Sequence, residues 1–266
     1  ISLSTWTFLS HLVLVNRAAR AVQSLLPIPG KTMPQASAFI HALLNPRRIA
    51  LIGASDNPNR TAGRPLRYLR RHGFEGTVYP INPRRQTVQG EPAWESLAAL
   101  PQAVDQAYIL LDTAPAMAAV EACATAGVPV VSVLADGFAE DGPEGAARQQ
   151  ALADIAAAAG IRLLGPNSMC VANVTAGMAL TVNAAFECED LIPGRTMVLS
   201  QSGSLMGTLL SRGQARGIGF HALMSLGNEA DLTIGEIGLA AVDDPNIDCF
   251  VLFMETIRRP DMLAAF

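Results

Sequence analysis

Residues 47–53 read RRIALIG, a short apolar run that ends in glycine and leads into the polar loop ASDNPNRTAG at 54–63. The segment RPLRYLRRHG (64–73) that follows has the composition of a helix. A strand that passes through a glycine turn into a helix is the first unit of a doubly wound α/β fold. The turn is the place where such folds bind a phosphate-bearing ligand.

The same pattern recurs along the chain. Further apolar runs predict strands at 76–82, 106–111, 128–135 and 161–166, with alanine-rich helical stretches between them. These runs are nearly continuous rather than alternating, which is typical of strands that are covered on both faces. The sequence therefore predicts an α/β fold with a mostly parallel, doubly wound sheet.

Residues 168–194 interrupt this rhythm with a polar connection that ends in LIPGR. A second series of predicted strands follows at 196–201, 220–227 and 248–255, and Phe266 lies within the next predicted helix. Three strands make a poor sheet, so we expect the second unit to be incomplete at its C-terminus.

Three segments follow from this reading. We expect an N-terminal extension at 1–45 that is non-native or disordered, a first domain at 46–190 and a second domain at 191–266. We assign no function to the extension.

Composition excludes several classes of protein. The net charge of −4 gives no electrostatic case for nucleic-acid binding, and no run of about 18 apolar residues is present that would predict a membrane span. The four cysteines are widely spaced and form no CxxC pair, which argues against a metal site and a disulfide framework and favours the cytoplasm.

Arginines gather at 47–48, 67–71 and 84–85, and we interpret these clusters as solvated faces, with a local anion site as the alternative.

The first glycine turn is not a G-x-G-x-x-G motif, because Gly63 is the next glycine after Gly53. The following strand ends in Asn82-Pro83-Arg84-Arg85 and has no carboxylate there to bind the ribose of NAD. Arginine at this place suits a phosphorylated ribose instead, which leaves NADP and the 3′-phosphate end of coenzyme A as candidates.

A second turn has the sequence LSQSGSLMG at 199–207. It does not fit the G-x-S-x-G elbow of a serine nucleophile, since Ser200 and Ser204 flank Ser202. Of the four histidines, His221 begins a predicted strand and is interpreted as structural. A strand that runs through Ser-Gly-Ser into a helix instead predicts an anion cradle, with simple hydroxyl capping of the helix as the alternative.

The ordered motifs RRIALIGAS, YPINP, DGFAEDGPEG, RLLGPNSMCVAN, VLSQSGSLMG, SLGNEADLTIGE and VLFMETIRRPDM resemble those of the NDP-forming acyl-CoA synthetases, which are related to the succinyl-CoA synthetase alpha subunit. The similarity covers roughly residues 45–266. It implies a Rossmann-like CoA-binding domain followed by a truncated flavodoxin-like ligase domain. It also implies the reaction of an acid, CoA and NTP to acyl-CoA, NDP and phosphate, through an acyl phosphate and a phosphohistidine.

The resemblance implies a role for residues of each turn. Glu255 would orient the catalytic histidine, whose SHTG or GHAG segment would lie beyond Phe266. The residues of the phosphate site would be Asn167, Ser202, Gly203 and Ser204, and those of the CoA site would be Gly53, Ala54, Ser55, Asn82, Pro83, Arg84, Asp136 and Gly137.

The resemblance also implies partners. ATP or ADP with Mg²⁺ would bind C-terminal ligase and ATP-grasp parts, or a separate beta subunit, and we expect a homo-oligomer. The segment Ser168-Met169-Cys170 departs from the family, which usually has glycine near the last position, so the shape of the acyl site stays open. Two alternatives also stay open: the ligase-like regulatory region of a protein lysine acetyltransferase, and an NADP-dependent oxidoreductase.

Overall fold

The first sheet of the structure is parallel throughout. The computed structural model describes residues 11–16 and 34–266. The strand order is β3-β2-β6-β7-β8, and every neighbouring pair is parallel. This confirms the predicted doubly wound sheet. The bounds are β2 (Arg48–Ile52), β3 (Thr77–Ile81), β6 (Gln106–Ile109), β7 (Val130–Val133) and β8 (Arg162–Leu164).

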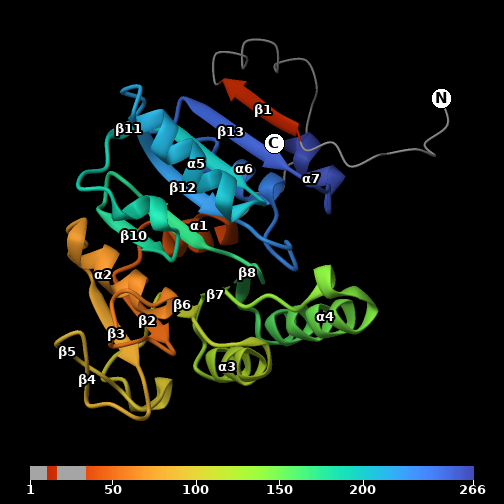
Figure 1. Ribbon diagram of the computed structural model, residues 1–266. Helices are drawn as coiled ribbons and strands as arrows, with labels where there is room; N and C mark the ends of the chain where they lie inside the picture. The colour runs from red at the N-terminus through yellow and green to blue at the C-terminus, as the bar shows by residue number, and fades with distance from the viewer. Residues whose placement is uncertain (1–10, 17–33) are drawn as a thin grey trace.

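Both faces of this sheet are buried, as the continuous apolar runs predict. Ala50 and Ile52 of β2 pack into a core with α3 (Thr113–Thr125) and α4 (Gly142–Ala159), while Ile49 and Leu51 face a second core. Helices α3 and α4 lie on the side of the sheet that faces away from the second sheet (Figure 1). Gly160 ends α4 in the left-handed conformation, with φ of 68°, as expected of a C-terminal cap.

The second sheet has the order β1-β13-β11-β12-β9-β10. Its centre is parallel and consists of β11 (Pro193–Ser200), β12 (Phe220–Ser225) and β13 (Cys249–Met254). These strands confirm the second predicted series. The helices of this part are α5 (Gly203–Gln214), α6 (Ile234–Ala241) and α7 (Pro260–Ala265).

The polar connection predicted at 168–194 is wrong in part, because it contains a hairpin that joins the second sheet. β9 (Cys170–Asn173) pairs antiparallel with both β12 and β10 (Met178–Thr181). Each strand has only four residues, and the polar residues Asn173 and Thr175 interrupt the apolar sequence between them. Val171 and Leu180 are nonetheless fully buried, and the hairpin extends the sheet beyond three strands.

The N-terminal extension is also more ordered than predicted where the structure describes it. α1 (Pro34–Leu44) buries Phe39 and Leu43 in the core that the two sheets share, and Asn173 donates a hydrogen bond to the carbonyl of Leu44 over 3.0 Å. β1 (His11–Asn16) pairs antiparallel with β13. The remainder of the predicted extension lies outside the described residues.

The two sheets are joined through one continuous core. The cluster that contains Leu51 and Tyr108 of the first sheet also contains Met197, Met224 and Leu252 of the second. A short hairpin, β4 (Thr87–Val88) and β5 (Glu91–Pro92), lies beyond β3. None of the helices in the described ranges has both the length and the apolar character of a bilayer span. The boundary at 190–191 stays a prediction.

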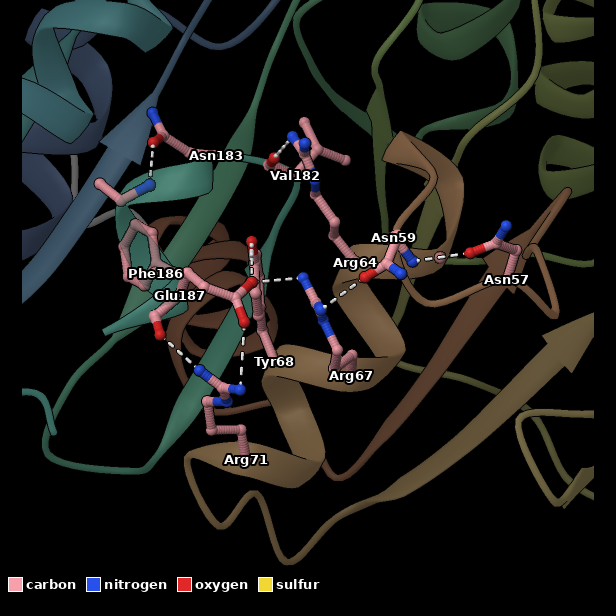
Figure 2. A network of polar contacts seen from close by, with 12 residues as sticks. Asn57, Asn59, Arg64, Arg67, Tyr68, Arg71, Val182, Asn183, Phe186 and Glu187 are labelled. Carbon is pink, nitrogen blue, oxygen red and sulfur yellow. Dashed lines mark hydrogen bonds and ion pairs between the residues drawn. The ribbon is translucent and has the colours of Figure 1, made fainter. Parts of the chain in front are cut away.

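A cluster of arginines on α2 (Arg64–Arg71) also connects the two parts. Figure 2 shows Arg67, Tyr68 and Arg71 converging on Glu187, with distances of 3.3 Å from the Tyr68 hydroxyl and 3.1 Å from Arg71. Arg64 donates to the carbonyl of Val182 over 3.0 Å. The interpretation of residues 67–71 as a solvated face is therefore wrong in part. Arg67 and Arg71 bind the segment that leads into β11, whereas Arg70 is exposed and pairs with Glu91 at 2.7 Å.

Candidate functional site

A cleft lies where the order of the first sheet reverses. The chain passes from β2 to β3 on one side and from β6 to β7 on the other, so the loops after β2 and β6 separate. Ligands of doubly wound folds bind at this switch point. The cavity there has a volume of about 840 Å³ and is lined by Asn59, Arg60, Thr61, Ala62, Leu110, Leu111, Asp112, Thr113, Leu134, Ala135, Asp136, Asn167 and Met169. We call it the switch-point cleft.

The predicted residues Gly53, Ala54 and Ser55 form the base of the loop that carries one wall of this cleft. Gly53 has φ of 87°, and a Cβ atom there would lie 2.5 Å from Leu111 Cδ2. The loop closes through the amide of Ser55, which donates to the carbonyl of Ala62 over 3.1 Å. These three residues therefore shape the cleft without lining it.

Asn82 connects the second predicted segment to that loop. Its side-chain amide donates to the carbonyl of Ala54 over 3.0 Å, and its Oδ1 accepts from the backbone of Arg84 over 3.0 Å. Pro83 and Arg84 are exposed and do not line the cleft. The neighbouring Arg85 forms an ion pair with Asp56 at 2.9 Å.

The opposite wall holds Asp136 and Gly137, which follow β7. Asp136 is exposed and lines the cleft, and its carbonyl accepts from Thr113 Oγ1 over 2.8 Å. Gly137 has φ of 79°, its amide donates to Glu140 over 2.8 Å, and its carbonyl accepts from Arg148. This turn is thus held by side chains of two helical segments.

The GPN turn at 165–167 closes the inner end of the cleft. The Asn167 amide donates to the carbonyl of Ala135 over 2.8 Å, and Asn167 lines the cleft. The loop after β12 packs on the turn, because the amides of Asn228 and Ala230 each donate to it over 2.9 Å. The first domain therefore meets the second at the point where the cleft ends.

The serine turn, defined as Ser202, Gly203 and Ser204, begins α5. Ser202 Oγ accepts from the backbone of Leu205 over 3.3 Å, so the capping role that the sequence left open is realised. The first amides of an α-helix have no acceptor within the helix, and the positive end of the helix dipole lies beside them. The turn thus retains the features of an anion site.

Met169 brings the cleft and the serine turn together. It lines the cleft, and a Cβ atom on Gly203 would lie 2.6 Å from Met169 Cγ. Asn183 holds the contact, because its amide donates to the carbonyl of Gly203 over 2.7 Å and to Met169 Sδ over 3.6 Å. A second cavity, of about 550 Å³, opens on the far side of Met169 and includes Ser204 and Arg64. No local pattern predicts these contacts, since the residues are far apart along the chain.

Glu255 lies beside the serine turn. The parallel register pairs Ser200 of β11 with Phe253 of β13, so the segments that leave these strands are neighbours. Glu255 is exposed, and its amide donates to Gln201 Oε1 over 2.6 Å. The structure therefore groups Glu255 with Ser202, Gly203 and Ser204. Of the predicted CoA residues, Asp136 lines the switch-point cleft, and the others lie in the loops around it without lining it.

Glu229 is a buried carboxyl that the sequence reasoning missed. Only 6% of it is exposed, its φ is 53°, and its Oε1 accepts from the amide of Ile234 over 3.0 Å. Burial raises its pKa to about 7, and hydrogen bonds from Gln201 and Ile234 and the charge of Arg258 offset part of that rise. An acidic residue within the run SLGNEAD gave no signal of burial.

His221 lies at the opposite edge of the sheet from the serine turn. It is buried near the start of β12, within 3.3 Å of Thr175 Oγ1, and burial lowers its pKa. It cannot serve Ser202 as a base. Across the described ranges, no group of three or more His, Cys, Asp or Glu side chains is arranged to hold a metal ion.

Two family models match this chain. The CoA-binding domain model matches residues 47–174, and the succinyl-CoA ligase-like flavodoxin domain model matches residues 193–266. The chain is 32% identical to the alpha subunit of acetate–CoA ligase (ADP-forming) I of Pyrococcus furiosus, over 82% of this chain and 47% of that subunit. It is also 32% identical to 4-hydroxybutyrate–CoA ligase (ADP-forming) of Nitrosopumilus maritimus, over 80% of this chain and 30% of that ligase.

Solved structures agree with these relatives. The dinucleotide-forming acetyl-coenzyme A synthetase 1 of Candidatus Korarchaeum cryptofilum superposes with a TM-score of 0.73 and 31% identity, over 78% of this chain and 44% of that chain. The same protein has been solved in complex with phosphate and ADP.

The fold and the matches define a CoA-binding domain followed by a succinyl-CoA ligase-like flavodoxin domain. In the order of these two domains the chain is similar to the ADP-forming acyl-CoA ligases, and it spans less than half the length of the relatives named above. Each of those relatives is a CoA ligase or synthetase, so the comparisons lend no support to the acetyltransferase or oxidoreductase alternatives.

Proposed function

We propose that this chain is the CoA-binding portion of an NDP-forming acid–CoA ligase. The complete ligase would convert a carboxylic acid, CoA and NTP to acyl-CoA, NDP and phosphate. The observation that carries the proposal is the position of Met169, which lines the switch-point cleft and also contacts the first residue of α5. A CoA molecule in the cleft would therefore direct its thiol toward a helix N-terminus suited to phosphate.

The chemistry divides between the two turns. The CoA thiolate attacks the carbonyl carbon of an acyl phosphate, the carbon–oxygen bond to phosphate breaks, and inorganic phosphate leaves. The serine turn would hold that phosphate through the Gly203 and Ser204 amides and the helix dipole, and Asn167 would lie at the same end of the cleft. In the reverse direction a histidine takes the phosphoryl group, and phosphoryl transfer asks the protein chiefly for positioning and charge stabilisation.

Glu255 would orient that histidine. A carboxylate that accepts a hydrogen bond from one ring nitrogen leaves the other free to attack phosphorus, and it stabilises the cation that forms. Glu255 is exposed beside the serine turn, as this role requires. We propose that the histidine belongs to a segment outside this chain.

The CoA site would use the cleft and its supporting loops. Arg60 is the cation among the lining residues and would face the CoA phosphates, while Asp136 lies on the opposite wall. Gly53, Ala54 and Ser55 with Asn82, Pro83 and Arg84 would set the conformation of the nucleotide end. Gly137 would set the conformation of the turn that carries Asp136.

The nucleotide and its metal would bind elsewhere. The described residues offer no group of three or more ligands for Mg²⁺, so we place ATP and Mg²⁺ on ligase and ATP-grasp domains beyond this chain or on a beta subunit. We further propose a homo-oligomer in the cytoplasm. Three cysteines whose side chains are described, Cys123, Cys188 and Cys249, are free thiols, which suits a reducing compartment.

The test uses the complete ligase with Glu255→Gln. We expect the variant to bind CoA normally and to fail to form phosphohistidine from acyl-CoA and phosphate, because the amide cannot stabilise a histidine cation. Undiminished phosphohistidine would refute the role of Glu255. An absence of acyl-CoA synthesis by the unaltered protein, over a range of carboxylic acids, would refute the proposed function itself.

A further inference from the structure

Gln201 connects the two halves of the phosphoryl site. The reaction proposed above needs the carboxylate turn, defined as Glu255 and Thr256, at a fixed distance from the serine turn. We infer that Gln201 is the positioning residue that sets this distance, an inference that rests on the proposed function.

The contacts of Gln201 reach both turns. Its Oε1 accepts from the amides of Glu255 over 2.6 Å and Thr256 over 2.9 Å, and its Nε2 donates to the carbonyl of Thr256 over 2.8 Å. Its own amide donates to the carbonyl of Phe253 over 3.1 Å. Gln201 directly precedes Ser202, the N-cap of α5, so one residue binds the carboxylate turn and leads into the serine turn.

The strand ladder does not extend to these turns. The pairing of β11 with β13 ends at Ser200 and Phe253, and β13 itself ends one residue later, at Met254. Glu255 and Thr256 are exposed, whereas Gln201 is only 8% exposed. The side-chain amide therefore continues the connection between the strands past the last ladder pair.

A glutamine suits this place because its amide carries both an acceptor and donors. The oxygen has two lone pairs for the two backbone amides, and the nitrogen has two hydrogens. One hydrogen binds Thr256, and the buried carboxyl of Glu229 also interacts with the Gln201 amide. The Gln201 side chain thus also contacts Glu229, which is itself fixed to the start of α6 by its hydrogen bond from the Ile234 amide.

The test measures phosphohistidine formation in the complete ligase from acyl-CoA and phosphate. Gln201→Leu keeps the side-chain volume and removes the three side-chain hydrogen bonds to the carboxylate turn, together with the one to Glu229. We expect the rate to fall about a hundredfold, as for a displacement of about 1 Å at a reacting group. The Kd for CoA should stay unchanged, because the switch-point cleft shares none of these contacts.

Gln214→Leu is the matched control. Gln214 also accepts from a backbone amide, that of Ile192 over 2.9 Å, and donates to the carbonyl of Asp190 over 3.3 Å, but it lies at the far end of α5. A loss of stability alone would affect both variants alike. We expect the control to retain its rate at a temperature where both variants are folded.

Gln201→Glu provides a readout that a merely structural role would not change. The new carboxyl can accept both backbone amides, but it can donate to Thr256 only while it is protonated. The carboxyl of Glu229 also faces this position, so the folded fraction is measured beside the rate at each pH. In folded protein we expect phosphohistidine formation close to the unaltered rate at low pH and a decline as the pH rises, with the unaltered protein as reference. If Gln201→Leu does not fold, Gln201→Glu tests the inference in its place.

The outcomes separate the inference from the proposed function. Loss of phosphohistidine in Glu255→Gln together with a normal rate in Gln201→Leu would overturn the inference alone. Equal losses in Gln201→Leu and Gln214→Leu, or a Gln201→Glu pH profile parallel to that of the unaltered protein, would also overturn it. A normal rate in Glu255→Gln would instead refute the role of Glu255 in the proposed function.

Discussion

The buried carboxyl of Glu229 makes the stability of this protein dependent on pH. Burial raises its pKa from the ordinary value of 4.5 to about 7. The folded protein therefore binds this proton more tightly than the unfolded chain. Replacing Glu229 with glutamine removes the ionisation and keeps an oxygen that can accept from the Ile234 amide.

The magnitude follows from that change in pKa. A tenfold change in an ionisation equilibrium is worth about 1.4 kcal/mol, so ionising Glu229 in the folded state costs about 3 kcal/mol. Because the folded pKa is the higher one, the cost is absent below pH 4.5, grows between pH 4.5 and about 7 and is complete above that range. The free energy of unfolding should therefore fall over this interval in the unaltered chain.

Urea unfolding at about pH 5 and pH 8 measures the effect. We expect Glu229→Gln to exceed the stability of the unaltered chain by about 1 kcal/mol at the lower pH and by about 3 kcal/mol at the higher. Glu121→Gln, at an exposed position of α3, is the control for the same chemical substitution outside the core. A stability difference that is the same at both pH values would refute the reasoning, since it would show that Glu229 does not ionise over this range.

Three further predictions concern the loops of the site. Gly227→Ala should lower the free energy of unfolding by well over about 1 kcal/mol, because a Cβ atom there would lie 2.1 Å from a carbonyl oxygen of the GPN turn. The control is Gly217→Ala, which has φ of 74° and open space around it, so it should lose only the free energy of holding alanine at a positive φ. Arg60→Glu should weaken CoA binding about tenfold by calorimetry, while Arg216→Glu, exposed and away from the cleft, should leave it unchanged. Ser202→Ala should cost about 1 kcal/mol in thermal or urea unfolding through loss of the α5 cap, and an unchanged stability would contradict that role.

The central strands of both sheets could be predicted from the sequence because each is a short apolar run between polar turns. The β9–β10 hairpin could not, since its two strands have four residues each and their burial depends on β12. Helix α1 was missed for a similar reason. Its apolar face is buried only because the two sheets enclose it.

The residues of the site also fall into those that local sequence predicted and those that it did not. The serine turn and the glycine turn follow predicted strands, so local sequence indicated both. Met169 and Gln201 were missed because their roles depend on contacts with Gly203 and Thr256, which only the assembled fold brings near. The arginines of α2 were read as solvated because Glu187, more than a hundred residues away, is the partner that binds them.

Titration of this chain with CoA, in parallel with NADP, tests the central claim most directly. The account predicts that CoA binds at one site per chain, with an affinity that falls about tenfold when Arg60 is replaced by glutamate, and that NADP does not bind. Tight binding of NADP with no affinity for CoA would contradict it.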